Sequence, residues 1–142
     1  MDYTCSYNPT LNTIEVSANG VANLTSLIEI EHRVAELCSK EESANILADY
    51  SEVEPGPLTL CDIDTLGGVT VSLRDIFKMR KCAHIVATGV QNGLVRTWEI
   101  IIKTKGFTDI ETRVFKKRSE AIEWIRTVPQ ESTNVDLSHI SE

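Results

Sequence analysis

The sequence predicts an α/β fold: a single mixed, largely parallel β-sheet with an N-terminal β-hairpin and about four flanking helices. Residues 84–89 form a short apolar run that is typical of a buried strand, and a helical apolar pattern follows it. A further strand is predicted over residues 110–115 and a helix over 119–125. Strands and helices that alternate at short spacing indicate a parallel or mixed sheet covered by helices.

The first two strands are expected to form the hairpin. Residues 3–7 alternate loosely between apolar and polar side chains, and residues 13–18 alternate strictly. The segment between them contains Pro9 between asparagines at positions 8 and 12, which favours a turn. Strict alternation places every second side chain of the second strand on one buried face.

A helix is predicted from about Asn23 to Lys40, because large apolar side chains recur there at helical spacing. A strand over residues 44–49 follows it. Two prolines and a glycine within residues 55–57 then stop any regular element. Apolar side chains return in residues 58–71, but Gly67-Gly68 interrupts them, so we expect an ordered loop with a short helix there.

Capping residues place the helix boundaries of the second half. Ser72 is predicted to cap a helix with Asp75 as its partner, and Asn92 is predicted to cap the long apolar helix that follows the strand over 84–89. Gly106 is expected to end that helix. Pro129 is expected to end the last one.

Length and composition predict one domain. A chain of 142 residues, 42% hydrophobic and 25% charged, is typical of a single soluble globule. We assign the α/β domain to residues 1–128 and a polar C-terminal tail to residues 129–142. No apolar run approaches the roughly 20 residues of a membrane span, and the N-terminus lacks the pattern of a secretory signal. A cytoplasmic location is therefore expected.

The four cysteines, at positions 5, 38, 61 and 82, are widely spaced and form no CxxC pair. Outside a secreted protein, such cysteines are expected to be reduced and mostly buried. No metal site and no cofactor is predicted from them.

Charge is distributed unevenly along the chain. Residues 1–71 carry twelve acidic and two basic side chains, whereas residues 72–142 carry nine acidic and twelve basic ones. Such asymmetry is compatible with a partner surface or with head-to-tail association, and also with two halves that each solvate their own helices. The net charge of −7 argues against a nucleic-acid partner.

The order of the predicted elements resembles that of SpoIIAA-like proteins of the STAS-like superfamily. The resemblance covers about residues 6–127 and implies a mixed sheet flanked by helices. Its segments are the hairpin over 8–16, the long first helix, the strands over 46–51 and 84–89, and a closing strand and helix over 111–125 that contain Phe115, Ala121 and Trp124.

The resemblance implies a regulatory role through protein partners. In strict STAS proteins, a Ser or Thr at a helix N-terminus is phosphorylated and controls binding to a kinase or an anti-sigma partner. The short motif that carries this site is absent after Asp49-Tyr50-Ser51. Thr70 and Ser72 lie in the corresponding region and are the candidate phosphosites, with a purely structural cap as the alternative for Ser72.

No catalytic residue is predicted. The sequence lacks the GxSxG, HExxH and GxxxxGK motifs. Asp62 and Asp64 come nearest to a carboxylate pair but have no basic partner nearby in the sequence. An enzyme would require a pocket that collects Asp49, Tyr50, Asp62 or Asp64 beside Arg96.

The leading functional hypothesis is a non-enzymatic, cytoplasmic SpoIIAA-like interaction or regulatory module that binds a protein partner or forms a homodimer. The alternative is a small apolar ligand or lipid bound in a pocket under the segment 58–71. The first hypothesis rests on the family resemblance, the charge asymmetry and the absence of catalytic motifs. The second rests on the segment 58–71, which is broken by Gly67-Gly68 and precedes a helix that is more apolar than one sheet face requires. The candidate ligand or partner surface consists of Leu66, Val69, Leu94, Trp98 and Ile101.

Overall fold

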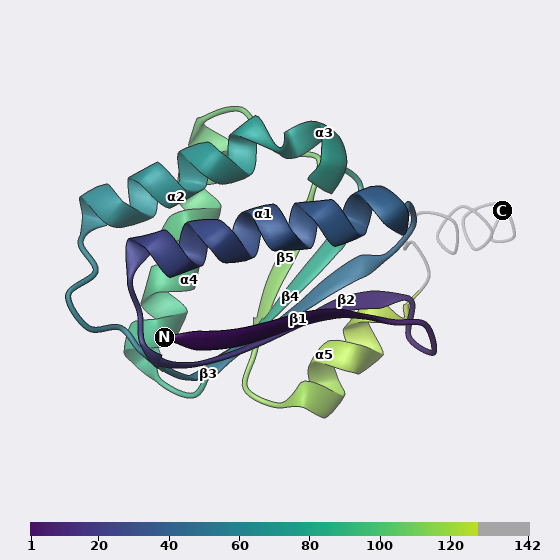
Figure 1. Ribbon diagram of the computed structural model, residues 1–142, viewed down its shortest axis with the longest axis horizontal. Coiled ribbons are helices and arrows are strands. Elements are labelled where there is room, and N and C mark those ends of the chain that lie inside the picture. Colours follow the sequence, from purple (N-terminus) through teal and green to yellow (C-terminus); the bar gives the residue numbers. More distant parts are fainter. Residues whose placement is uncertain (128–142) are drawn as a thin grey trace, which may run out of the picture.

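The computed structural model describes residues 1–127, which form five strands and five helices (Figure 1). In chain order they are β1 (Asp2–Asn8), β2 (Thr13–Val21), α1 (Leu24–Lys40), β3 (Asn45–Glu54), α2 (Leu60–Ser72), α3 (Arg74–Phe77), β4 (Lys81–Ile85), α4 (Gly89–Thr104), β5 (Glu111–Phe115) and α5 (Arg118–Ile125).

All five strands belong to one sheet, in which they lie in chain order from β1 to β5. β1 is antiparallel to β2, whereas β2, β3, β4 and β5 are parallel to one another. In this register Ile14, Ile46 and Cys82 are neighbours across three strands, and all three are buried. The predicted mixed, largely parallel sheet with an N-terminal hairpin is confirmed.

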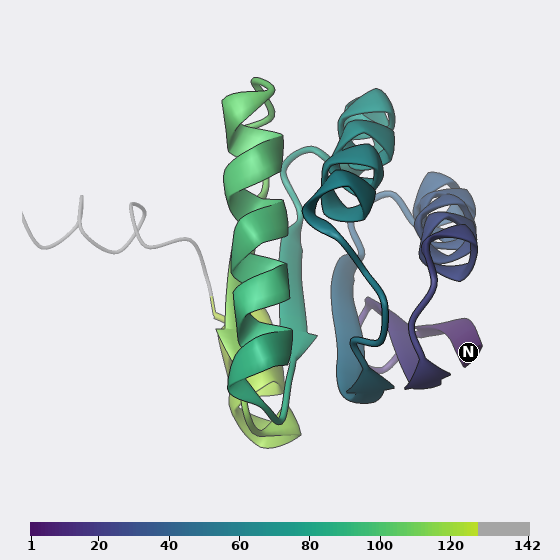
Figure 2. The same cartoon turned by 90° about the vertical axis from the view of Figure 1, so that its left-hand side faces the viewer.

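The helices cover the two faces of the sheet unequally. α1 packs on the hairpin, and α4 packs at the β3 and β5 side. α2 lies between α1 and α4 and makes its main contacts with those two helices rather than with the sheet (Figure 2). α5 covers the opposite face, where Ala121 and Ile125 pack against Leu47, Ala83 and Ile85 (Figure 1).

The expectation of a loop with a short helix over residues 58–71 was wrong, because α2 is a continuous helix. Thr59 caps it, and Asp62 returns the hydrogen bond to the backbone N–H of Thr59. The two glycines do not break it. A Cβ on Gly67 would lie 2.5 Å from Ile101 on α4, so this glycine allows the two helices to approach closely.

Two predicted caps were also wrong. Ser72 is the last residue of α2, and its hydroxyl donates to the carbonyl of Val69, so it caps no following helix. α4 begins before Asn92 and is capped by Thr88, with Gln91 completing the reciprocal pair of hydrogen bonds. Threonine three residues before glutamine is a standard capping sequence, and here it starts the helix at Gly89.

β4 spans Lys81–Ile85 rather than residues 84–89, because Thr88 must leave the sheet to cap α4. β3 extends past residue 49 to Glu54, where it pairs with the end of β2 beyond an irregularity in the register. The predicted tail over 129–142 lies outside the described residues.

Candidate functional site

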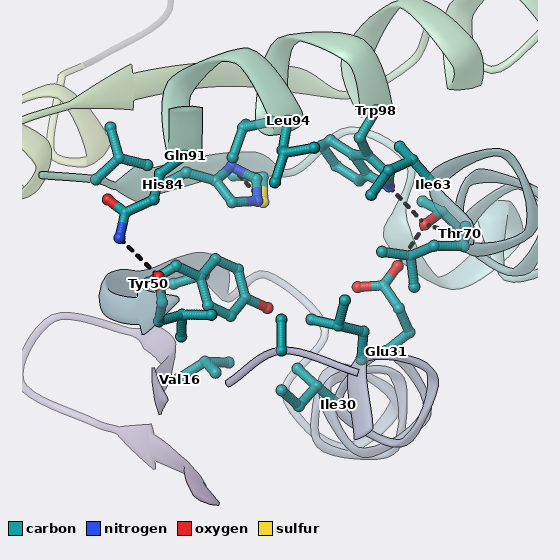
Figure 3. Close-up of a pocket in the computed structure, with 18 of the residues that line it drawn as sticks. Val16, Ile30, Glu31, Tyr50, Ile63, Thr70, His84, Gln91, Leu94 and Trp98 are labelled. Carbon is teal, nitrogen blue, oxygen red and sulfur yellow. Dashed lines mark hydrogen bonds between the residues drawn. The ribbon is translucent and has the colours of Figure 1, made fainter. Parts of the chain in front are cut away.

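A cavity of about 110 Å³ lies under α2, between that helix, the sheet, α1 and α4 (Figure 3). It follows from the packing, because α2 bridges its two neighbouring helices and does not rest on the strands. Its wall is mainly apolar. The apolar lining consists of Val16, Ala22, Leu27, Ile30, Val34, Ile46, Ala48, Val53, Pro55, Leu58, Ile63, Leu66, Phe77, Val86, Leu94, Val95, Trp98 and Ile110.

A chain of hydrogen bonds crosses one end of this cavity. The indole Nε1–H of Trp98 donates to the Thr70 hydroxyl at 3.0 Å. The Thr70 hydroxyl in turn donates to Oε1 of Glu31. These side chains come from α4, α2 and α1, so one polar chain connects three of the helices that line the cavity.

Glu31 is the one carboxylate among the lining residues in the described part of the chain. Burial penalises its charged form and raises its pKa from 4.5 to about 7, although the Thr70 hydrogen bond lowers the pKa in part. None of the ion pairs formed within residues 1–127 includes Glu31. This carboxyl therefore changes its protonation state near neutral pH.

Two polar groups point into the cavity from opposite walls. Figure 3 shows the second carboxylate oxygen of Glu31 and the hydroxyl of Tyr50 both directed at the interior. No hydrogen bond formed within residues 1–127 includes the Tyr50 hydroxyl or this second oxygen of Glu31. Because no fully buried side-chain oxygen or nitrogen in this part of the chain lacks a partner, both atoms retain some accessible surface in the cavity. Burial and the nearby Glu31 raise the pKa of Tyr50 well above its usual value, so the phenol stays protonated. The cavity thus has an apolar body and a polar end.

His84 forms part of the wall between two aromatic rings. Its ring stacks on Tyr50 with centroids 6.0 Å apart and meets Trp98 edge-on at 5.2 Å. Burial lowers the pKa of His84 from 6.5 to about 4. The imidazole is therefore neutral at physiological pH, and it brings no positive charge to the cavity.

Gln91 fixes the start of α4 against the end of β3. Its amide oxygen accepts from the backbone N–H groups of Ala87 and Thr88 at 2.6 and 3.0 Å. Its amide nitrogen donates to the carbonyls of Ser51 and Val53 at 3.1 and 2.8 Å. Because Gln91 and Val53 both line the cavity, these bonds set the shape of its wall.

The structure places the five residues of the predicted ligand or partner surface at the junction of α2 and α4. Leu66, Leu94 and Trp98 line the cavity. Ile101 packs on Gly67, and Val69 is half-buried on α2. Trp98 is buried and the other four are half-buried.

The two candidate phosphosites lie in the last turn of α2, at the opposite end from the N-terminus of that helix. Thr70 is 1% exposed, and its hydroxyl is fully engaged with Glu31, Trp98 and the carbonyl of Leu66. Ser72 is exposed. Phosphorylation at Thr70 would require α2 to move.

The residues that an enzyme would need do not converge. Asp62 belongs to the cap of α2, and Asp64 pairs with Lys105 at 3.4 Å. Arg96 lies 3.8 Å from Glu99. Of that set, Tyr50 alone lines the cavity in the described structure. The carboxylate–arginine site considered from the sequence is therefore not formed.

Sequence reasoning missed Glu31. The signal was present, because Glu31 lies four residues after Leu27 and three before Val34, within the apolar stripe of α1. A carboxylate at such a position is either neutralised or functional. His84, on β4, is a further cavity-lining residue that was not identified from the sequence.

Other features of residues 1–127 that bear on function are the cysteines, the potential metal ligands and the apolar character of the helices. All four cysteines are free thiols; Cys38 and Cys82 are buried, and burial raises the pKa of both. No group of three or more potential metal ligands is found in this part of the chain. None of its helices combines the length and apolar character needed to cross a bilayer.

Fold and cavity together define an α/β module with one mixed sheet and, between that sheet and the helices on one of its faces, a small apolar site with a polar end. The family model of SpoIIAA-like proteins matches residues 13–126. The chain therefore belongs to the SpoIIAA-like family, as the sequence resemblance indicated. Comparison with curated proteins and with solved structures found no match.

Proposed function

We propose that this SpoIIAA-like protein binds a small apolar ligand in the cavity under α2. The observation that carries the proposal is the cavity itself: about 110 Å³ inside a core, with apolar walls and two inward-pointing polar groups without protein partners. Protein interiors are normally packed without space of this size, and binding sites typically combine apolar walls with a few placed polar groups.

Native mass spectrometry of the freshly purified chain tests for a ligand that co-purifies. A direct test uses toluene as a probe and follows backbone amide shifts by NMR. We expect shifts confined to residues around the cavity, together with a rise in melting temperature that grows with toluene concentration. Absence of both effects at saturating toluene would refute the proposal.

A cavity-filling variant sharpens this test. Ala48 is buried on β3 and lines the cavity, so Ala48→Leu places additional carbon atoms in the free space. We expect the variant to fold and to lose toluene binding. Ala87→Leu is the matched control, because Ala87 is exposed. Toluene binding should be unchanged in this control.

The interaction or regulatory module predicted from the sequence remains a second hypothesis. The specific observation in its favour is family membership over residues 13–126. Light scattering after size exclusion at two concentrations tests self-association. A monomer at high micromolar concentration would rule out the homodimer and leave the ligand proposal unaffected.

A further inference from the structure

The polar end of the cavity points to the chemical class of its ligand. Resting on the proposed function, we infer that the cavity selects a compact apolar compound carrying one hydroxyl group, such as a phenol or a small alicyclic alcohol, and excludes carboxylates.

A hydroxyl group matches the two polar atoms that face the cavity. The Tyr50 hydroxyl offers a donor, and the second oxygen of Glu31 offers an acceptor. A ligand hydroxyl can accept a hydrogen bond from Tyr50 and donate one to Glu31, so a single hydroxyl can pair with both groups. A purely apolar ligand would exclude water from both groups without offering them a partner, which is costly.

Charge complementarity excludes an acid. A ligand carboxylate would lie near Glu31, and the described lining residues include neither lysine nor arginine. The neutral state of His84 adds no compensating positive charge. Burying an anion without a cationic partner or a full set of donors is strongly unfavourable. A fatty acid is therefore a poor candidate despite the apolar walls.

The volume limits the size of the apolar part. A cavity of roughly 150 Å³ with aliphatic and aromatic walls holds one benzene molecule. The cavity here is about 110 Å³ and thus smaller, so one six-membered ring is the upper limit for the apolar part of the ligand. The walls that would contact this ring include Ile63, Leu66 and Leu94.

The test uses the full chain at pH 8 and four probes in two isosteric pairs. Toluene and phenol differ by a methyl and a hydroxyl group, and nitrobenzene and benzoate differ by charge. Transfer from water disfavours phenol unless its hydroxyl is paired. We expect the wild type to bind phenol at least as tightly as toluene, and to bind nitrobenzene while rejecting benzoate.

Two variants assign the effect to the polar end. Tyr50→Phe should weaken phenol binding by about three- to tenfold, the range of one neutral hydrogen bond, and leave toluene binding within about twofold. Glu31→Gln should reduce the discrimination between nitrobenzene and benzoate. Toluene affinity in each variant shows whether the cavity is intact.

The outcomes separate this inference from the proposed function. If neither toluene nor phenol binds, the proposed function fails. If toluene binds but the phenol-to-toluene ratio is the same in wild type and Tyr50→Phe, the hydroxyl inference is overturned and the apolar site stands. Benzoate binding as tight as that of nitrobenzene in the wild type would overturn the exclusion of acids.

Discussion

Glu31→Gln should stabilise the protein above neutral pH and have little effect in mild acid. Glutamine has nearly the same shape, and its amide oxygen can still accept from Thr70, but it carries no charge. In the folded protein the pKa of Glu31 is about 7, against 4.5 for the ordinary side chain. At about 1.4 kcal/mol per pH unit, ionising Glu31 costs the fold about 3 kcal/mol.

The direction in which stability changes with pH follows from the number of protons bound in the folded and unfolded states. Between pH 4.5 and 7 the folded state keeps the proton on Glu31 and the unfolded state releases it, so stability falls as pH rises through this window. His84 acts in the opposite direction: its folded pKa of about 4 means that stability falls as pH drops below 6.5. The two effects oppose each other between about pH 4.5 and 6.5, so the wild-type profile alone is not diagnostic.

Urea unfolding of wild type and Glu31→Gln at pH 5, 6, 7 and 8 isolates the carboxyl, because the contribution of His84 cancels in the difference. We expect the advantage of the variant to grow by about 2–3 kcal/mol between pH 5 and pH 8. Glu29→Gln, at an exposed position of the same helix, is the matched control and should change the free energy of unfolding by less than about 0.5 kcal/mol. If the difference in free energy of unfolding between Glu31→Gln and wild type did not change with pH, the claim that desolvation raises the pKa of Glu31 would be refuted.

Three further predictions concern the packing around the cavity. Thr70→Val keeps the shape but removes the hydroxyl that joins three helices, so urea unfolding should show a loss of about 2–4 kcal/mol; Thr65→Val, exposed on the same helix, should change stability by less than about 0.5 kcal/mol. Gly67→Ala brings a Cβ to 2.5 Å from a side chain of α4 and should destabilise the protein by about 1–3 kcal/mol. At Gly68→Ala the added Cβ meets no atom within 4 Å, so this variant should stabilise the protein by up to about 1 kcal/mol. Thermal melts check this pair, because the two melting temperatures should shift in opposite directions. Arg80→Met removes donors to four backbone carbonyls and should cost about 3 kcal/mol or more. A melting temperature within a few degrees of wild type would contradict this prediction.

The sheet was predictable because its strands carry local signals. Alternation in β2 and the apolar run around His84 identify strands without any knowledge of their neighbours. Their ends were less predictable, because they depend on competition with a cap. Thr88 lies outside β4 because it caps α4, where it exchanges two hydrogen bonds with Gln91.

α2 was missed because its glycines carry a tertiary meaning. Gly67 lowers local helix propensity, but its missing side chain makes room for Ile101 on another helix. Contacts between helices outweigh propensity once the chain is folded. The lower helix propensity of Gly67 can be read from the local sequence, whereas the close helix contact that it allows involves Ile101, a residue 34 positions away.

The candidate site shows the same limit more strongly, because no two of its polar residues are close in sequence. Glu31, Tyr50, Thr70 and Trp98 come from four different elements and meet only in the assembled fold. Since the hydrogen-bond chain joins α1, α2 and α4, any ligand or proton that binds Glu31 also changes the interaction holding α2 in place. By thermodynamic linkage, a partner that contacts α2 and a ligand in the cavity would affect each other's affinity whenever either one shifts that helix. The two functional hypotheses therefore depend on one physical element, the helix that covers the cavity.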